Sequence, residues 1–310
     1  MQESNITSIT EFILLGFQSL QCFKAISLLI LLVIYSMTLC GNLLIITLVF
    51  YSKNLQTPMY LFLTQLSTSD IMLTTAIIPN MLYTIVNEVG TISFVGCITQ
   101  FYFFAVTECS ECLLLTVMSY DRYLAICNPL RYNCIMDSAL CIKLIIISWL
   151  ISFSLLLIDT VTLGLLHFCG PLIIDHFFCD YPPLLERSCS DTNVLQLEVI
   201  FLSFPVLILP FILIIVSYVY IIQVILRLPS FTERQKSFSA CSSHLTTVSI
   251  FYTTLFCIYV LPTRGQSQSI SKVLSLFYTV VTPLINPIIY SLRNKDMKKA
   301  FEKYICKIVL

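Results

Sequence analysis

Four residues that can carry charge or make hydrogen bonds stand together at the end of a long apolar run: Tyr120, Asp121, Arg122 and Tyr123. The run from Phe94 to Met118 can cross a hydrocarbon core of about 30 Å, since a helix rises about 1.5 Å per residue. Arg122 is therefore expected at a membrane face, with Asp121 as its immediate partner. An isolated Asp-Arg pair is usually only a local interfacial contact, but its place at the end of a span favours a function.

Three acidic side chains fall inside predicted membrane spans: Asp70, Glu108 and Glu111. Acids inside a membrane are costly to bury, so they indicate a function by default. Asp70 with Glu111 is predicted to hold a cation or one shared proton, because two nearby carboxylates resist ionising together. A neutral, hydrogen-bonded cluster that only packs the bundle explains the pattern equally well, and Asn42 and Asn286 suit either interpretation.

Composition places the chain among integral membrane proteins. Hydrophobic residues make up 57% of its 310 residues and charged residues 11%, whereas a soluble domain has about 25% charged residues. The chain contains no basic tract of the kind that would indicate a nucleic-acid partner. The chain is not expected to be an enzyme, because it has no Ser-His-Asp arrangement, phosphate-binding glycine loop or HExxH motif, and its three histidines are scattered.

Apolar runs of about 20 residues predict seven membrane-spanning helices. The expected fold class is an all-α seven-transmembrane helix bundle, with an N-terminal tail at 1–24, the bundle at 25–292 and a C-terminal segment at 293–310. The predicted spans are Ala25–Phe50, Met59–Val86, Phe94–Ile126, Leu140–Leu163, Val199–Leu226, Phe238–Val260 and Val273–Leu292.

The charge distribution predicts the orientation of the bundle. With the N-terminus outside, the inner segments hold thirteen of the 17 Lys and Arg residues, as the positive-inside rule requires. Asn5 begins an Asn-Ile-Thr sequon, which is glycosylated only on the lumenal or extracellular side. We therefore expect an extracellular N-terminus and, after seven spans, a cytoplasmic C-terminus.

Two further patterns concern the later part of the chain. Prolines remove backbone hydrogen bonds and predict kinks or hinges in spans five to seven, at Pro210, Pro262, Pro283 and Pro287. After the seventh span, apolar residues recur at helical spacing among lysines and predict a short amphipathic helix on the inner leaflet, with membrane lipid as its partner. The apolar residues are Met297, Ala300, Phe301 and Tyr304.

The longest connection, between spans four and five, contains Cys169, Cys179 and Cys189, and Cys97 stands at the outer end of span three. Four cysteines on the oxidising side allow three pairings, and their spacing does not choose among them. Any pairing that includes Cys97 would hold the loop over the mouth of the bundle. A metal site at His176, Cys179 and Asp180 is disfavoured, because a fourth well-spaced ligand is lacking.

Several motifs together make the chain resemble the rhodopsin-like G-protein-coupled receptors, and within them the odorant receptors of the tetrapod type. They extend along nearly the whole chain. The motifs are Gly41-Asn42, Leu55-Gln-Thr-Pro58-Met59-Tyr60, Leu66-Ser67 with Asp70, Met118-Ser-Tyr-Asp-Arg-Tyr-Leu-Ala-Ile-Cys127, Ser217-Tyr218, Lys236-Ser-Phe-Ser-Ala-Cys241-Ser-Ser-His244 and Pro283-Leu-Ile-Asn286-Pro287 running to Tyr290.

The resemblance implies a receptor of the plasma membrane that binds a small volatile odorant and activates an olfactory-type stimulatory G protein, raising cAMP. It implies disulfides between Cys97 and Cys179 and between Cys169 and Cys189, and no required cofactor beyond a possible allosteric sodium ion at Asp70 and Glu111. The residues implied in G-protein coupling and switching are Asp121, Arg122, Tyr123, Tyr218, His244, Asn286, Pro287 and Tyr290.

The resemblance also implies an odorant pocket in the outer half of the bundle, between spans three, five, six and seven. Its expected lining is Phe101, Phe104, Ala105, Glu108, Cys109, Leu202, Ser203, Val206, Tyr252, Leu255, Phe256, Tyr259, Leu276 and Thr279.

Two departures from the family pattern stand out. Gln56 takes the place of the usual histidine in a loop, where we expect little effect, and Glu108 stands where a small or uncharged residue is usual. We expect Glu108 to favour a cationic or hydrogen-bond-donating odorant such as an amine. Alternatively, Glu108 stays protonated beside Glu111 and contributes only to structure.

Two other function classes fit parts of the sequence. A small-solute transporter or channel would use Asp70, Glu108 and Glu111 as an ion path, but transporters often contain paired repeats and none is visible in the sequence. A structural membrane protein that has lost signalling is the other class, and the intact Arg122 argues against it.

Overall fold

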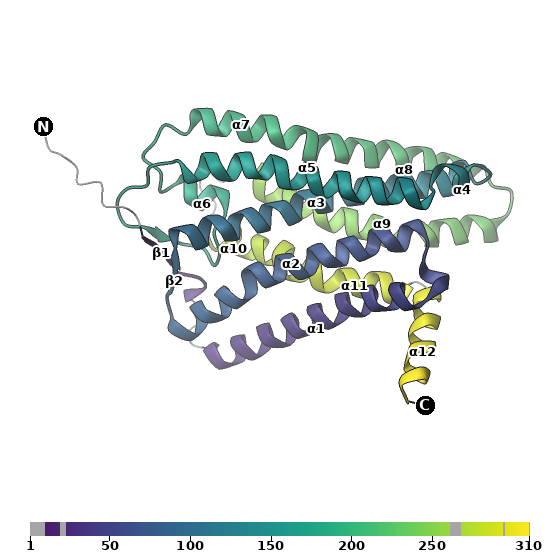
Figure 1. Ribbon diagram of the computed structural model, residues 1–310, viewed down its shortest axis with the longest axis horizontal. Helices are drawn as coiled ribbons and strands as arrows, with labels where there is room; N and C mark the ends of the chain where they lie inside the picture. The colour runs from purple at the N-terminus through teal and green to yellow at the C-terminus, as the bar shows by residue number, and fades with distance from the viewer. Residues whose placement is uncertain (1–9, 19–22, 261–267, 294, 310) are drawn as a thin grey trace, which may run out of the picture.

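The computed structural model describes residues 10–18, 23–260, 268–293 and 295–309. Seven of its helices are long and apolar enough to cross a membrane. They lie side by side as a single bundle (Figure 1). The predicted all-α seven-span fold is therefore confirmed.

The observed helices cover the predicted spans, with ends shifted by zero to seven residues. The largest shifts are at spans five and six, which begin six and seven residues before the apolar runs. A helix can continue beyond the hydrocarbon because its backbone hydrogen bonds do not require apolar side chains. The helices are α1 (Lys24–Tyr51), α2 (Pro58–Asn87), α3 (Phe94–Cys127), α5 (Ser138–Gly164), α7 (Asn193–Ser203) continuing into α8 (Leu209–Arg227), α9 (Phe231–Leu255), and α10 (Gln268–Leu276) continuing into α11 (Thr282–Arg293).

Local sequence signals explain where several helices begin. Pro58 opens α2, a position at which its missing N–H costs nothing. Ser93 caps α3 by accepting a hydrogen bond from the Gly96 N–H at 3.1 Å. Asp137 caps α5 in the same way, from the Leu140 N–H at 2.7 Å.

Spans five, six and seven each contain a five-residue π-helical segment, at Phe204–Ile208, Phe256–Val260 and Phe277–Val281. The first contains Pro205 and runs directly into α8, where Pro210 stands in the first turn. The third ends just before Pro283. Widened turns therefore lie near Pro205, Pro210 and Pro283, whereas Pro287 stands inside the helix α11. Kinks or hinges at the prolines stay a prediction. Pro262 lies outside the described residues.

A small three-stranded sheet covers one end of the bundle, which we call the lid end. Strand β1 (Glu11–Leu14) pairs antiparallel with β2 (Gly90–Ser93) and parallel with β3 (Ile173–Ile174). The lid also contains the short helix α6 (Tyr181–Leu185), and it lies at the left of Figure 1. The described part of the predicted N-terminal tail is thus built into the structure, with Phe12 and Leu14 fully buried.

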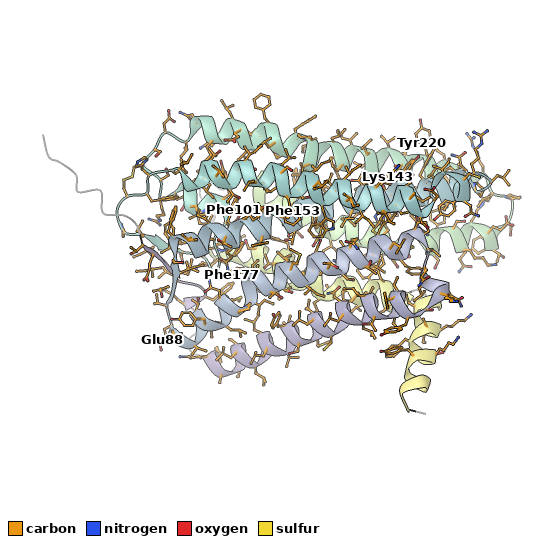
Figure 2. All side chains as sticks on the ribbon, viewed as in Figure 1. Glu88, Phe101, Lys143, Phe153, Phe177 and Tyr220 are labelled. Carbon is orange, nitrogen blue, oxygen red and sulfur yellow. A yellow bond between two sulfur atoms is a disulfide. The ribbon has the colours of Figure 1, made fainter. Side chains whose placement is uncertain are left out.

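The opposite end, which we call the Arg122 end, carries two short helices. Helix α4 (Tyr132–Ile135) follows α3, and α12 (Lys295–Val309) leaves the bundle at a steep angle (Figure 1). Met297 of α12 is buried and Tyr304 packs against the core, whereas Phe301 stays 38% exposed. The predicted amphipathic helix is therefore present. Figure 2 shows Phe177 toward the lid end and Lys143 and Tyr220 toward the Arg122 end.

Close packing of α1 on α11 supports a stability prediction. A Cβ atom at Gly41 would lie 3.1 Å from the Cγ atom of Pro287, whereas a Cβ at Gly164 would meet nothing within 4 Å. Gly41→Leu should therefore lower the free energy of unfolding by about 1–3 kcal/mol through overpacking. Gly164→Leu is the control and should change it by less than about 0.5 kcal/mol. Thermal unfolding of the two purified variants in detergent measures the difference, and equal melting temperatures would contradict the packing argument.

Candidate functional site

The lid is fastened to α3 at the point where the predicted odorant pocket begins. Cys97 of α3 forms a disulfide with Cys179, with a Cα–Cα distance of 5.5 Å, and the Cys179 N–H donates to the Gln100 Oε1 at 2.9 Å. A second disulfide joins Cys169 and Cys189 within the loop. The structure thus adopts the pairing that the family resemblance implies.

Aromatic side chains of the lid, α3 and span seven meet where the predicted pocket would begin. Phe178 of the lid packs edge-on against Phe104 at a centroid distance of 5.1 Å, and Tyr278 lies 5.7 Å from Phe104 and 6.4 Å from Phe178, so the three rings form one cluster. The buried members of the predicted set are Phe101, Phe104, Glu108, Cys109, Val206, Tyr252, Leu255 and Thr279. Ala105, Leu202, Ser203 and Leu276 are half-buried.

Phe256 and Cys109 lie differently from the expected pocket positions. Phe256 is 53% exposed, because it stands on the membrane-facing side of its π-helical segment. Cys109 lies beside Ser152 of α5, so its thiol faces a neighbouring helix. The side chain of Tyr259 lies outside the described residues, as does Asn5 of the predicted glycosylation site.

The intramembrane acids lie together in the middle of the bundle. Asn286 of α11 donates to both carboxylate oxygens of Asp70 at 3.2 Å. Glu111 is 2% exposed and Glu108 is 9% exposed, and each has one buried carboxylate oxygen that makes no hydrogen bond with the described residues. The three carboxylates are close enough to repel one another. Within the described part of the chain, no group of three or more His, Cys, Asp or Glu side chains is arranged as a metal site.

At the Arg122 end, the predicted charge pair is present and closed. Arg122 donates to the Asp121 Oδ2 from two nitrogens, at 2.9 and 3.2 Å. The hydroxyl of Tyr132 donates to the other oxygen, Oδ1, at 2.7 Å, so helix α4 is tied to the same carboxylate. Asp121 is fully buried, so these three hydrogen bonds replace the hydration that its carboxylate loses.

A second contact closes the Arg122 end by joining α8, α9 and α3. The His244 Nε2 lies 3.1 Å from the Leu115 carbonyl oxygen, and the Nδ1 lies 2.7 Å from the Tyr218 hydroxyl. A carbonyl can only accept, so Nε2 carries the proton; in the neutral ring Nδ1 then accepts from Tyr218. Breaking this contact is a requirement for moving α9 away from α3.

The remaining predicted switch residues lie close by but make different contacts. Tyr123 packs against Tyr220 of α8 at a centroid distance of 6.2 Å. Tyr290 is 1% exposed and lies within electrostatic range of Arg122. Pro287 lies against α1, where its Cγ atom would be 3.1 Å from a Cβ atom at Gly41.

The sequence analysis missed a polar contact that holds the lid to span seven. Lys272 of α10 forms an ion pair with Asp175 and donates to the Gly16 carbonyl oxygen at 2.8 Å. Asp180 also faces span seven, because it accepts a hydrogen bond from the Tyr278 hydroxyl at 3.4 Å. Residues 11–14 read Glu-Phe-Ile-Leu, so no alternation of polar and apolar residues marked this strand in the sequence.

His176 of the lid is held without charge. It is 3% exposed and stacks on Phe177 at a centroid distance of 4.7 Å. Burial and then the nearby Lys272 ammonium lower the pKa of His176 to about 3. Protonation of this ring therefore favours states in which it is exposed to water.

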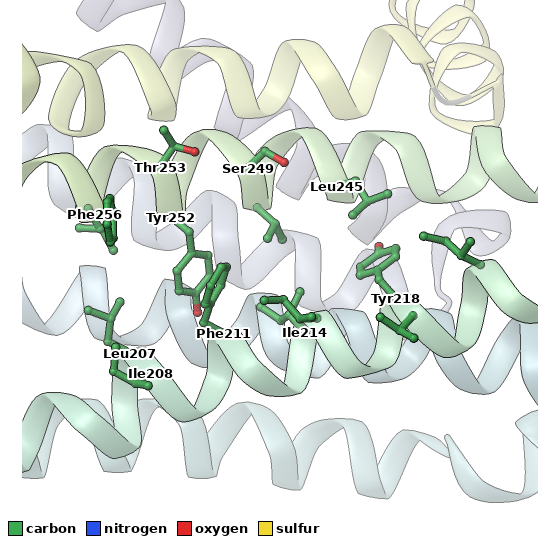
Figure 3. A pocket seen from close by; sticks show the side chains of 15 residues that line it. Leu207, Ile208, Phe211, Ile214, Tyr218, Leu245, Ser249, Tyr252, Thr253 and Phe256 are labelled. Atoms are coloured by element: carbon green, nitrogen blue, oxygen red, sulfur yellow. The ribbon is translucent and has the colours of Figure 1, made fainter. Parts of the chain in front are cut away.

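A separate cavity lies between α8 and α9, away from the acids. Its volume is about 550 Å³, and it shares only Tyr252, Leu255 and Phe256 with the predicted odorant pocket (Figure 3). The odorant residues of α3 do not line it.

Comparison with known proteins gives consistent matches. A family profile described as "Olfactory receptor" matches residues 31–308. The chain is 44% identical to human olfactory receptor 11L1 over 303 residues, covering 98% of this chain and 94% of the relative. It is 46% identical to human olfactory receptor 10A7 over 311 residues, covering 99% and 97%. It is 43% identical to mouse olfactory receptor 5AP2 over 310 residues, covering 100% and 98%.

The state of His176 predicts how the lid responds to pH. In the unfolded chain His176 binds a proton near pH 6.5, whereas in the folded chain its pKa is about 3. The contribution of the neutral His176 ring to folding stability is therefore fully present above pH 6.5 and is lost as the pH falls from 6.5 toward 3. From pH 7.5 to 5 the loss should be about 2 kcal/mol. Thermal unfolding across this range measures it. His176→Phe keeps the stacked ring and should remove this part of the pH dependence.

His167, exposed on the same loop, is the matched position for a control. His167→Phe should leave the pH dependence unchanged. If both variants follow the parent protein between pH 7.5 and 5, then His176 does not carry the effect.

Proposed function

We propose a specific function for this chain, which belongs to the olfactory receptor family and is therefore an odorant-sensing G-protein-coupled receptor and not an enzyme. As a family member with seven spans it is a multi-pass protein of the plasma membrane. The finer proposal is that a small volatile ligand binds beneath the lid and activates an olfactory-type stimulatory G protein, which raises cAMP. It would do so by shifting an existing equilibrium toward a state with an open Arg122 end.

One observation carries this proposal: α3 bears a buried acid beneath the lid and the closed Arg122 pair at its other end. A ligand that contacts Glu108 therefore acts on the same rigid helix that presents Arg122. The contacts of Arg122 with Asp121 and of His244 with Leu115 would have to open before a G protein could enter. In this proposal the lid end is extracellular and α12 lies on the cytoplasmic leaflet, as the distribution of Lys and Arg indicates.

The chemistry of Glu108 supports an amine or another hydrogen-bond-donating odorant. Its Oε2 is buried and lacks a hydrogen-bond partner among the described residues, whereas a buried polar atom is normally paired. The second nearby acid is Asp180 of the lid. Two carboxylates that face the same space favour a positively charged group between them.

We also propose that Asp70 and Glu111 hold an allosteric sodium ion. The donor set fits such an ion, since Glu111 has an unpaired buried oxygen and hard cations prefer oxygen ligands. The ion would neutralise part of the repulsion between the acids. Asn286 would keep Asp70 oriented toward the site through its two hydrogen bonds.

Replacing Arg122 tests the signalling function. Arg122→Ala should abolish a ligand-evoked cAMP rise in cells that express the chain with an olfactory-type stimulatory G protein, because no other side chain would take its place at the opened end. Lys143→Ala removes another exposed cation at the same end and should keep the response (Figure 2). Surface expression is measured for both variants. An undiminished response of Arg122→Ala at equal surface expression would refute the coupling role.

Replacing Glu108 tests the ligand class. Glu108→Gln removes the charge but keeps the shape, so the concentration of amine needed for half-maximal cAMP should rise by roughly 10- to 100-fold, while responses to esters stay the same. Glu198→Gln is the control, because that acid is engaged by Thr162 at 3.1 Å outside the proposed pocket. An unchanged ranking of amines against esters would favour a purely structural Glu108.

A further inference from the structure

The cavity between α8 and α9 is an apolar groove that runs along the bundle. Its volume of about 550 Å³ falls within the range of about 300–1,000 Å³ typical of small-molecule sites. From Ile208 to Ile222 the groove follows fifteen residues of span five, or roughly 21 Å for the fourteen steps between them at about 1.5 Å each. In Figure 3, Tyr252 of α9 points toward Phe211 of α8.

One side of the groove opens toward the membrane. Ile215 is 46% exposed, Val219 is 47% exposed and Phe256 is 53% exposed, although all three line the cavity. These residues lie in segments that cross the hydrocarbon, where water does not enter. An occupant must therefore arrive dissolved in the bilayer, which excludes charged molecules such as the amines proposed for Glu108.

Two hydroxyl groups in the groove make no hydrogen bond with the backbone of their own helix. Hydroxyls inside membrane helices usually bond a carbonyl one turn back, as Thr246 and Thr254 do at 2.8 and 2.7 Å. Ser249 and Thr253 also line the groove, one turn apart, and within the described residues their hydroxyls have no hydrogen-bond partner. An unpaired hydroxyl in hydrocarbon costs free energy that a ligand acceptor would recover.

The groove also contacts the closed switch. The ring of Tyr218, whose hydroxyl bonds His244, forms part of its wall. Phe211 and Tyr252 pack together at a centroid distance of 4.7 Å and bridge the two helices (Figure 3). An occupant of the groove would therefore contact the side chains that link α8 to α9.

We propose that this groove is a second ligand site, which takes an uncharged lipophilic molecule with a single carbonyl or hydroxyl group from the bilayer. Ser249 and Thr253 donate hydrogen bonds to that group, and the hydrocarbon walls hold the remainder. Because the groove exists while Tyr218 and His244 are bonded, its ligand stabilises the closed Arg122 end and opposes activation.

Photolabelling of the full-length protein in nanodiscs tests the site directly. Benzophenone is the probe, since it is lipophilic, uncharged and carries one carbonyl. After irradiation, mass spectrometry should place the label on peptides from α8 and α9 that line the groove. An excess of 2-tridecanone should displace it, whereas tridecane, which lacks the carbonyl, should not.

Variants assign the labelling to the groove. Val219→Trp fills the groove and should reduce labelling several-fold, while Val216→Trp places the same ring on an equally exposed position outside it. Val216→Trp should leave the labelling unchanged. Ser249→Ala combined with Thr253→Val should weaken displacement by 2-tridecanone about tenfold, because two hydrogen bonds are lost.

The proposal that the groove ligand inhibits receptor activation rests on the proposed function, whereas the photolabelling of the groove does not. If the site and its direction are both correct, 2-tridecanone lowers the maximal cAMP response to an agonist, and Val219→Trp removes this effect. Labelling without inhibition would keep the site and overturn its regulatory direction. Labelling spread evenly over all lipid-facing helices, equal displacement by tridecane, or equal labelling of the two tryptophan variants would overturn the site, because bulk lipid chains would then be its only occupant.

Discussion

Hydrocarbon offers no hydrogen-bond partner, so every polar side chain inside the membrane must find its partner within the protein. This constraint decides how the helices meet. Asn286 joins α11 to α2 through Asp70, Asn42 joins α1 to the Pro283 carbonyl at 3.1 Å, and His244 joins α9 to α3. Apolar surfaces alone would pack in many registers, since lipid is as apolar as leucine. The polar contacts select one register.

The places where this rule is broken are as informative as the places where it is kept. Glu108 and Glu111 each keep a buried oxygen without a described partner, and Ser249 and Thr253 leave hydroxyls unpaired toward the bilayer. Unpaired polar groups in a low-dielectric interior cost stability. At the acids and in the groove, a ligand or ion would supply the missing partner, whereas other buried polar atoms without a described partner, such as the Asn80 Nδ2, belong to neither location.

The lid end and the Arg122 end differ in how firmly they are closed. The lid is held by two disulfides, a three-stranded sheet and the ion pair of Lys272 with Asp175. Among the described residues, the polar contacts that close the Arg122 end are hydrogen bonds and one ion pair, which can exchange partners, and neither described disulfide lies there. Between them, spans five, six and seven contain the π-helical segments, where the helices are least regular. Movement is therefore easier at the Arg122 end than at the lid end.

The sequence by itself determined the number of spans, their approximate limits, the Asp121–Arg122 pair and the amphipathic α12, because each depends on local periodicity or on immediate neighbours. It did not determine that residues 11–14 form a strand of the lid, that Lys272 holds that lid, or that Phe256 faces the membrane. Nor did it reveal a groove between α8 and α9. These features depend on which residues meet across the bundle. Only the tertiary structure decides them, since such contacts arise from the rotation of each helix about its axis and from the path of long loops, and neither is encoded in a single apolar run.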